Sequence, residues 1–187
     1  MSTNLEVETK IKISEKNVNS IRNKIKSLAE FSKKETKTDV YYSHKNKNYP
    51  KKAFRIRSNG KNYVVNFKNW MRHLYSIDIV VKKEHEFTLN TKDQVDNFLA
   101  LMEDLGFKKW MQKTKITETY RYKKEKKLSI ELSNVKKLGW FIELEYLCQE
   151  NEVQKAKSTI REAIKKLSIN PNQIDNTGYT KMLFNHK

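Results

Sequence analysis

The stretch that decides the fold is Leu5-Glu6-Val7-Glu8-Thr9-Lys10-Ile11-Lys12-Ile13. Side chains of a β-strand alternate between two faces, so the charged residues share one face and the aliphatic residues share the other. The charges are sorted along the strand, with two carboxylates before two lysines. Paired carboxylates suit a hard divalent cation, and paired lysines suit a phosphate chain. The alternative is an ordinary half-buried strand whose charged face lies in water.

Composition predicts one compact domain over residues 1–187, because 37% of the residues are hydrophobic and 11% are aromatic although 33% are charged. The formal net charge of +17 favours an anionic partner or substrate. A nucleic acid, a nucleotide, polyphosphate and an acidic surface all satisfy that condition.

Several classes of site are excluded by what the chain lacks. Cys148 is the only cysteine, which excludes an internal disulfide and a multi-cysteine zinc site and fits a reducing compartment. The four glycines form neither a P-loop nor a dinucleotide-binding motif, so a bound phosphate would need side-chain cations. No apolar run approaches the roughly 18 residues that span a bilayer, and the first residues lack a signal-peptide pattern. We therefore expect a cytoplasmic protein without a membrane partner.

The remaining pattern predicts alternating strands and helices. Apolar periodicity predicts helices that begin after Ser14, at a capping box from Thr91 to Gln94, at Asn151 with Gln154, and at 178–184. Strands are predicted at 54–57, 63–68, 77–88, 110–122, 128–135 and 140–147, with a turn at Asn59-Gly60 joining the first two. The polar and basic segment 33–52 is predicted to be mostly a solvated loop.

The charged faces of these strands suggest a barrel. Seven or eight antiparallel strands can close so that alternation directs one set of side chains into a lumen. Enclosed charges cost many kcal/mol unless they are paired, hydrated or liganded, so such a lumen should bind counter-ions. The candidate phosphate-binding residues are Lys10, Lys12, Arg55, Arg57, Lys68, Lys113 and Lys115, and the candidate ligands for Mg²⁺ or Mn²⁺ are Glu6, Glu8, Glu143 and Glu145. Lys82 shares a face with Glu84 and Glu86.

An ordered set of motifs extends nearly the whole length of the chain. They are Glu6-x-Glu8-x-Lys10, Asp39-Val-Tyr-Tyr42, Phe54-Arg-Ile-Arg57, Phe67-Lys68, Lys82-x-Glu84-x-Glu86, Leu105-Gly-Phe107, Phe141-Ile-Glu-Leu-Glu145 and Gly178-Tyr-Thr-Lys-Met-Leu183. In this order they resemble the CYTH, or triphosphate tunnel metalloenzyme, superfamily, which includes class IV adenylate cyclases and thiamine triphosphatases.

The resemblance implies an α+β fold with an eight-stranded antiparallel barrel and flanking helices. It implies that the cations, Lys82 among them, bind a triphosphate and that the acids bind one or two divalent metal ions. It also links Lys68 and either Tyr41 or Tyr42 to the activation of water. The family usually has an Asp where this chain has Ser133, and Glu131 is a candidate metal ligand in its place. Lys113, Lys115 and Thr117 allow two registers for the basic strand.

Three functions remain open at this stage. The first is metal-dependent hydrolysis of inorganic triphosphate, thiamine triphosphate or a nucleoside triphosphate. The second is a class IV adenylate cyclase, which would also need a site for the purine. The third is a non-catalytic binder of nucleic acid or polyphosphate, for which the basic runs at 33–34, 45–52 and 123–127 argue. We expect a monomer or a homodimer.

Overall fold

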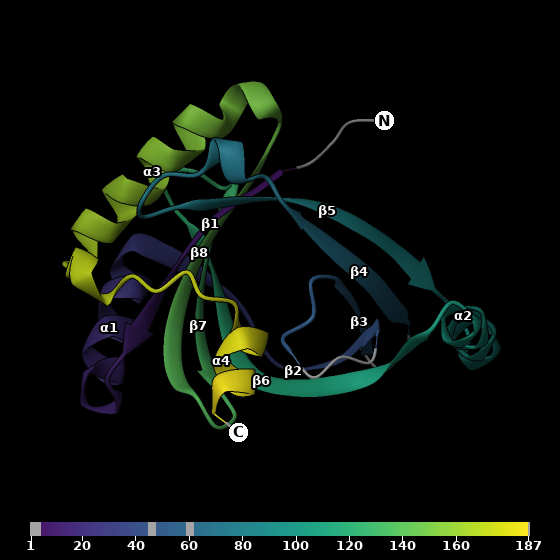
Figure 1. Cartoon of the computed structure of the whole chain (residues 1–187). Helices are drawn as coiled ribbons and strands as arrows, with labels where there is room; N and C mark the ends of the chain where they lie inside the picture. Colours follow the sequence, from purple (N-terminus) through teal and green to yellow (C-terminus); the bar gives the residue numbers. More distant parts are fainter. Residues whose placement is uncertain (1–4, 45–47, 59–61, 187) are drawn as a thin grey trace.

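The protein is a closed antiparallel β-barrel with helices on its outside (Figure 1). The computed structural model describes residues 5–44, 48–58 and 62–186, so the expected turn at Asn59-Gly60 lies outside the described residues. The strands are β1 (Leu5–Ile13), β2 (Ala29–His44), β3 (Ala53–Ser58), β4 (Tyr63–Trp70), β5 (Val80–Leu89), β6 (Phe107–Tyr122), β7 (Leu128–Val135) and β8 (Gly139–Cys148). They pair in the order β1-β5-β4-β3-β2-β6-β7-β8, which closes on itself. The predicted α+β fold with an eight-stranded barrel is confirmed.

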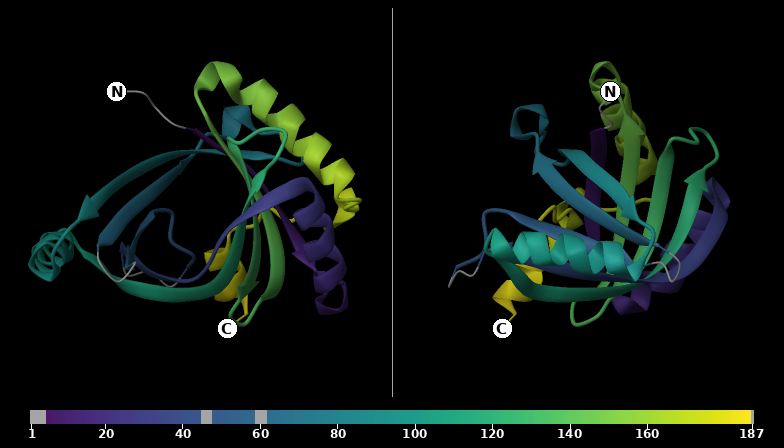
Figure 2. Two further views of the ribbon diagram at one scale, coloured as in Figure 1. Left: turned by 180° about the vertical axis from the view of Figure 1, so that it is seen from behind. Right: turned by 90° about the vertical axis from the view of Figure 1, so that its right-hand side faces the viewer.

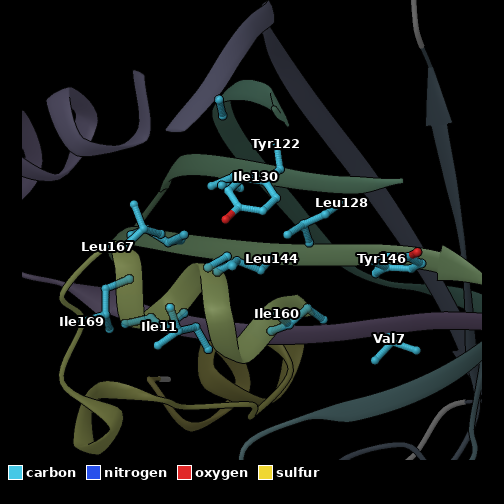
Figure 3. Close-up of a cluster of buried hydrophobic side chains, with 14 of the residues drawn as sticks. Val7, Ile11, Tyr122, Leu128, Ile130, Leu144, Tyr146, Ile160, Leu167 and Ile169 are labelled. Carbon is cyan, nitrogen blue, oxygen red and sulfur yellow. The ribbon is translucent and has the colours of Figure 1, made fainter. Parts of the chain in front are cut away.

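One apolar layer covers the outer face of β1, β7 and β8. Two helices, α1 (Val18–Leu28) and α3 (Val153–Lys166), lie over this face in both ribbon views (Figures 1 and 2). Val7 and Ile11 of β1 pack there with Leu144 of β8 and Ile160 of α3 (Figure 3). All four side chains are fully buried, so the aliphatic face of the opening strand points outward, toward the helices.

A second apolar layer lies at the far end of the barrel, under α2 (Lys92–Asp104). Phe54 and Ile56 of β3 pack there with Val65 of β4 and Val95 of α2. The helix begins as predicted, because the Thr91 side chain accepts a hydrogen bond from the Gln94 backbone N–H.

These two layers decide which side chains face the lumen. Because side chains alternate along a strand, the residues next in sequence to the outward aliphatic residues must point into the barrel. The interior therefore holds charged side chains from all eight strands, while the apolar cores lie between the barrel and its helices.

The last segment of the chain crosses one end of the barrel. Asp175 donates its backbone N–H to the carbonyl of Lys10, and the short helix α4 (Tyr179–Asn185) follows. The Tyr179 ring lies edge-on to Phe141 of β8, with the ring centroids 5.0 Å apart. This helix lies beside β6 in Figure 1.

Three local predictions were wrong. The first part of the predicted loop at 33–52 instead belongs to the long strand β2, which runs to His44 because β6 pairs along it. Strand β5 begins at Val80 rather than Ile77. The third helix is preceded by a capping box between Gln149 and Glu152, not between Asn151 and Gln154. No helix in the described part of the chain is long and apolar enough to cross a membrane.

Candidate active site

One group of carboxylates, the acidic cluster, gathers in the lumen from three strands. It consists of Glu6 and Glu8 of β1, Glu84 of β5 and Glu145 of β8. Ligand oxygens of Glu6, Glu8 and Glu145 lie within 4.8 Å of one another. Two lysines pair with this cluster: Lys68 Nζ lies 2.8 Å from Glu6 and 2.5 Å from Glu84, and Lys82 forms an ion pair with Glu8.

The acidic cluster has more negative charge than its lysines neutralise. Burial, and then the charges of Glu131 and Glu6, raise the pKa of Glu145 well above its usual value. Burial also raises the pKa of Glu8 to about 7, although the attraction of Lys82 opposes the rise. In Glu6, by contrast, burial opposes the charged form, but Lys68, Lys82 and the hydrogen bonds with Glu8 and Glu84 together hold the pKa well below its usual value. The cluster thus contains buried carboxyls that a cation would stabilise in their charged form.

A second group, the cationic cluster, surrounds Asp39 of β2, which is fully buried. Arg57 donates to both carboxylate oxygens at 2.6 and 3.1 Å, and Lys113 approaches within 2.9 Å. Arg55 and the hydroxyl of Tyr41 each lie 3.4 Å from Asp39 Oδ2. Burial would raise the pKa of Asp39, but these cations hold it far below its usual value.

Arg55 joins the two clusters. Burial lowers the pKa of Arg55, but Asp39, Tyr41, Glu84 and Glu6 together raise it above its usual value. Its Nε atom is buried and has no hydrogen-bond partner among the described residues. An unpartnered buried guanidinium N–H fits an anionic acceptor, such as a phosphate oxygen.

A third set of charges is already balanced. Lys115 Nζ lies 2.8 Å from Glu131 and 2.6 Å from Glu143, and Lys37 Nζ lies 2.6 Å from Glu131. Burial would raise the pKa of Glu143, but Lys115 lowers it, and Lys115 with Lys37 does the same for Glu131. Oxygens of Glu131, Glu143 and Glu145 also lie within 4.8 Å of one another, although two lysines occupy this set.

The donor types fit a hard divalent cation. Carboxylate oxygens are the ligands that Mg²⁺ and Mn²⁺ prefer, and both groups of three carboxylates contain Glu145. The group of Glu6, Glu8 and Glu145 is the better fit, because Glu84 shares Lys68 with Glu6 and so adds a fourth carboxyl to a cluster that has two lysines. These three carboxylates would hold such an ion here.

The structure places most of the predicted residues in the lumen and two of them outside it. Lys82 forms ion pairs with Glu8 and Glu6, and the Lys10 Nζ lies 4.4 Å from the Tyr179 ring centroid. Tyr42 stacks on Phe54 in the outer layer under α2, so only Tyr41 of the pair faces the site. Lys12 is exposed near the end of β1. Tyr42 and Lys12 therefore lie apart from the clusters in the lumen, the first because of strand alternation and the second because the strand ends there.

The uncertain positions on β6 and β7 are resolved by the register. Lys113 and Lys115 both face the lumen, where each pairs with a carboxylate. Ser133 faces it too, with its hydroxyl 2.9 Å from that of Thr117, and Glu131 lies one pleat away on the same face. Ser133 carries no charge, so the place of the usual Asp is neutral.

Three lumen residues were missing from the predicted site, namely Lys37, Asp39 and Glu84. The signal for Glu84 was present, because it shares a face with Lys82. Lys37 lies in the segment 33–52 that was predicted to be a loop. Asp39 is part of the motif Asp39-Val-Tyr-Tyr42, but no separate signal in the sequence points to its role.

Three lysines of the basic run at 123–127 pair with acids on the outer surface. Lys124, Lys126 and Lys127 lie 2.7, 2.6 and 2.7 Å from Glu162, Glu30 and Glu152. These pairs weaken the case for the run at 123–127 as a nucleic-acid-binding surface.

The closed barrel thus forms a tunnel whose lumen carries separate acidic and cationic clusters. The chain belongs to the CYTH domain family, whose match covers residues 4–179. Among curated proteins, no match to the chain is found.

Solved structures with the same fold cover nearly all of the chain. A protein of Pyrococcus horikoshii is 26% identical, with a TM-score of 0.74 over 97% of this chain and 99% of its own. A candidate adenylate cyclase of Vibrio parahaemolyticus is 14% identical, with a TM-score of 0.71 over 96% of this chain and 97% of its own. A candidate adenylyl cyclase of Hippeastrum, described as having a dominant triphosphatase activity, is 14% identical, with a TM-score of 0.61 over 94% of this chain and 91% of its own. The two cyclase-like structures support the fold alone.

Proposed function

We propose that this protein is a metal-dependent phosphohydrolase that releases orthophosphate from a linear triphosphate. The observation that carries the proposal is the pairing of two unbalanced clusters in one lumen, with Arg55 between them. The acidic cluster lacks positive charge and the cationic cluster lacks negative charge. A divalent cation together with a triphosphate supplies both.

In this proposal, basic residues bind the phosphates and carboxylates bind the metal ion. Arg55, Arg57, Lys113 and Lys115 would bind phosphate oxygens, the arginines through two N–H groups at once. Lys68 and Lys82 would hold the phosphates nearest Glu6 and Glu8. A Mg²⁺ or Mn²⁺ ion held by Glu6, Glu8 and Glu145 would neutralise charge on the phosphate oxygens.

Hydrolysis of the terminal phosphate requires that the protein position a water molecule beside the terminal phosphorus and stabilise the charge on the phosphates. The water oxygen attacks the terminal phosphorus and the bond from that phosphorus to the bridging oxygen breaks. The rest of the substrate leaves with the bridging oxygen, the water loses a proton to solvent, and orthophosphate is formed. Positioning and charge stabilisation supply most of the catalysis in such reactions. The Tyr41 hydroxyl, which faces the lumen beside Arg55, and Lys68 are the groups placed to orient that water. The described activity of the Hippeastrum structure favours hydrolysis over cyclisation.

The test is a product assay with tripolyphosphate and with ATP, each with Mg²⁺ or Mn²⁺. We expect orthophosphate from at least one triphosphate and no cyclic AMP. Equal rates of pyrophosphate and cyclic AMP formation from ATP would show a cyclase instead. Binding without any product would show a silent binder of polyanions.

A further inference from the structure

The last segment of the chain brings a tyrosine ring into one end of the barrel. Ile174 forms a β-bridge with Ile11 of β1, and the Asn176 side chain accepts a hydrogen bond from the backbone N–H of Lys10. From there the chain turns into α4, which lies beside β6 (Figure 1). Tyr179 is the first residue of this helix, and only 7% of it is exposed.

The Tyr179 ring lies against three lysines of the lumen. Its centroid is 4.4 Å from the Nζ atom of Lys10, 5.2 Å from that of Lys113 and 5.8 Å from that of Lys115. All three ammonium groups are within the roughly 6 Å over which the face of an aromatic ring attracts a cation. The lysines come from β1 and β6, which are not neighbours in the barrel, so one ring contacts cations from two parts of the wall.

Lys10 depends on the last segment more than the other two lysines do. Lys113 and Lys115 each pair with a carboxylate, whereas Lys10 forms no ion pair with an acid among the described residues. Its Nζ donates instead to the backbone carbonyl of Thr177. Burial lowers the pKa of Lys10 to about 8, although the charge of Glu143 opposes the fall. A carbonyl and a ring, both neutral, therefore hold this buried ammonium group.

A neutral group that holds a lysine differs from a carboxylate in what it leaves for a substrate. A carboxylate also cancels the charge of the lysine, whereas a ring face attracts the ammonium group and leaves its net charge in place. Burial, and then the charge of Glu143, raise the pKa of Tyr179 well above its usual value, so the phenol stays neutral. Its hydroxyl has no hydrogen-bond partner among the described residues, so the ring is the part of Tyr179 that contacts the lysines.

We propose that Tyr179 is a positioning residue, whose ring holds Lys10 and Lys113 where they receive the terminal phosphate of the substrate. The inference rests on the proposed function, which places the phosphates on the lysines of the lumen. The ring centroid of Tyr41, the tyrosine placed to orient the water, lies 5.9 Å from Lys113 Nζ. The terminal phosphate and its water would thus lie at this end, with the rest of the substrate pointing away from Tyr179.

The competing explanation is that Tyr179 only attaches α4 to the barrel. Its ring packs edge-on against Phe141, in an apolar cluster that also includes Val135 and Leu138. An apolar side chain of similar size would serve that purpose as well as a ring does. A leucine in place of Tyr179 therefore separates the two explanations.

The experiment is calorimetric titration of tripolyphosphate into the wild type, Tyr179→Leu and Tyr179→Phe. Tyr179→Leu keeps an apolar side chain without a ring face and should lose about tenfold in affinity. Tyr179→Phe keeps the ring and should stay within about twofold of the wild type. Met182→Ala is the matched control, because Met182 packs against the same apolar cluster but has no ring. It should loosen α4 and leave the affinity within about twofold of the wild type.

Unchanged affinity in Tyr179→Leu, or an equal loss in Met182→Ala, would overturn the positioning role and leave the triphosphatase proposal standing. A second measurement does not depend on phosphate binding. In NMR spectra of protein labelled with ¹³C at lysine Cε, the ring current should shift the Lys10 signal, which Lys10→Arg identifies by removing it. The shift should disappear in Tyr179→Leu and persist in Tyr179→Phe.

The NMR measurement also keeps the two proposals separate. A wild-type Lys10 signal without the shift would overturn the positioning role, even if Tyr179→Leu does not fold. If the wild type binds no tripolyphosphate, the proposed function fails. In that case a shift that Tyr179→Leu removes still supports the ring as the group that holds Lys10.

Discussion

The acidic and cationic clusters share one lumen but are unbalanced in opposite directions. In the acidic cluster, four carboxyls from Glu6, Glu8, Glu84 and Glu145 face Lys68 and Lys82. In the cationic cluster, the single carboxyl of Asp39 faces Arg55, Arg57 and Lys113. The pKa of Glu145 is raised and the pKa of Asp39 is lowered as a result. The comparison thus distinguishes Asp39, whose charge is balanced by protein cations, from Glu145, whose charge we expect a bound metal ion to balance.

The largest effect should follow from removing the charge of Asp39. Asp39→Asn leaves three cations around a buried neutral group, which should lower the free energy of unfolding by about 3 kcal/mol. Chemical denaturation of the variant and the wild type measures this difference. A variant as stable as the wild type would show that Asp39 does not hold the cationic cluster together.

The same substitution at the acidic cluster should behave in the opposite way. Because the pKa of Glu145 is raised, its charge opposes folding at neutral pH, and Glu145→Gln should be at least as stable as the wild type. Its affinity for Mn²⁺ should fall by at least about 100-fold, since it belongs to both groups of carboxylates. Denaturation and Mn²⁺ titration test the two parts, with Glu30→Gln on the outer surface as the control. Loss of stability with unchanged Mn²⁺ affinity would reverse the assignment.

Protons should compete with the metal ion at the acidic cluster. The pKa of Glu8 is raised to about 7, so its proton must leave before the carboxylate can bind a cation. Metal affinity without substrate should therefore rise about tenfold between pH about 6 and pH about 8. Calorimetric Mn²⁺ titrations at several pH values measure this slope, and Glu8→Gln should flatten it. A wild-type affinity independent of pH would contradict the proposed ligand set.

The smallest expected effect separates two neighbouring tyrosines. Tyr41→Phe removes the hydroxyl that faces the cationic cluster and should lower kcat by about five- to tenfold. Tyr42→Phe changes a ring in the outer layer and should leave kcat within about twofold. Steady-state kinetics of both variants with tripolyphosphate test the pair. Equal effects would mean that the orientation of these side chains does not decide their roles.

Strand alternation made much of the lumen predictable from the sequence. In β1 and β3 apolar residues occupy alternate positions, apart from Thr9, so the direction of Glu6 and Arg55 follows from the pattern alone. Strand β2 could not be read in this way. Residues 33–37 are polar at every position, so no apolar alternation distinguishes their two faces. Lys37 was missed for that reason.

Contacts between distant segments also could not be predicted from the sequence. The apolar stripe at 178–184 predicted a helix, but not that Tyr179 would meet Phe141 and Lys10 at the barrel end. The choice between Tyr41 and Tyr42 required the register of β2, which the motif leaves open.

The most direct test of the account is whether the two clusters form one site. Calorimetric titration with tripolyphosphate, with and without Mn²⁺, should show that the metal ion strengthens binding to the wild type by at least about tenfold. In Glu145→Gln this dependence should vanish, which separates an effect of the protein from complex formation in solution. Equal dependence on Mn²⁺ in both proteins, or none in the wild type, would contradict the claim that the acidic and cationic clusters act together on a metal ion and a triphosphate.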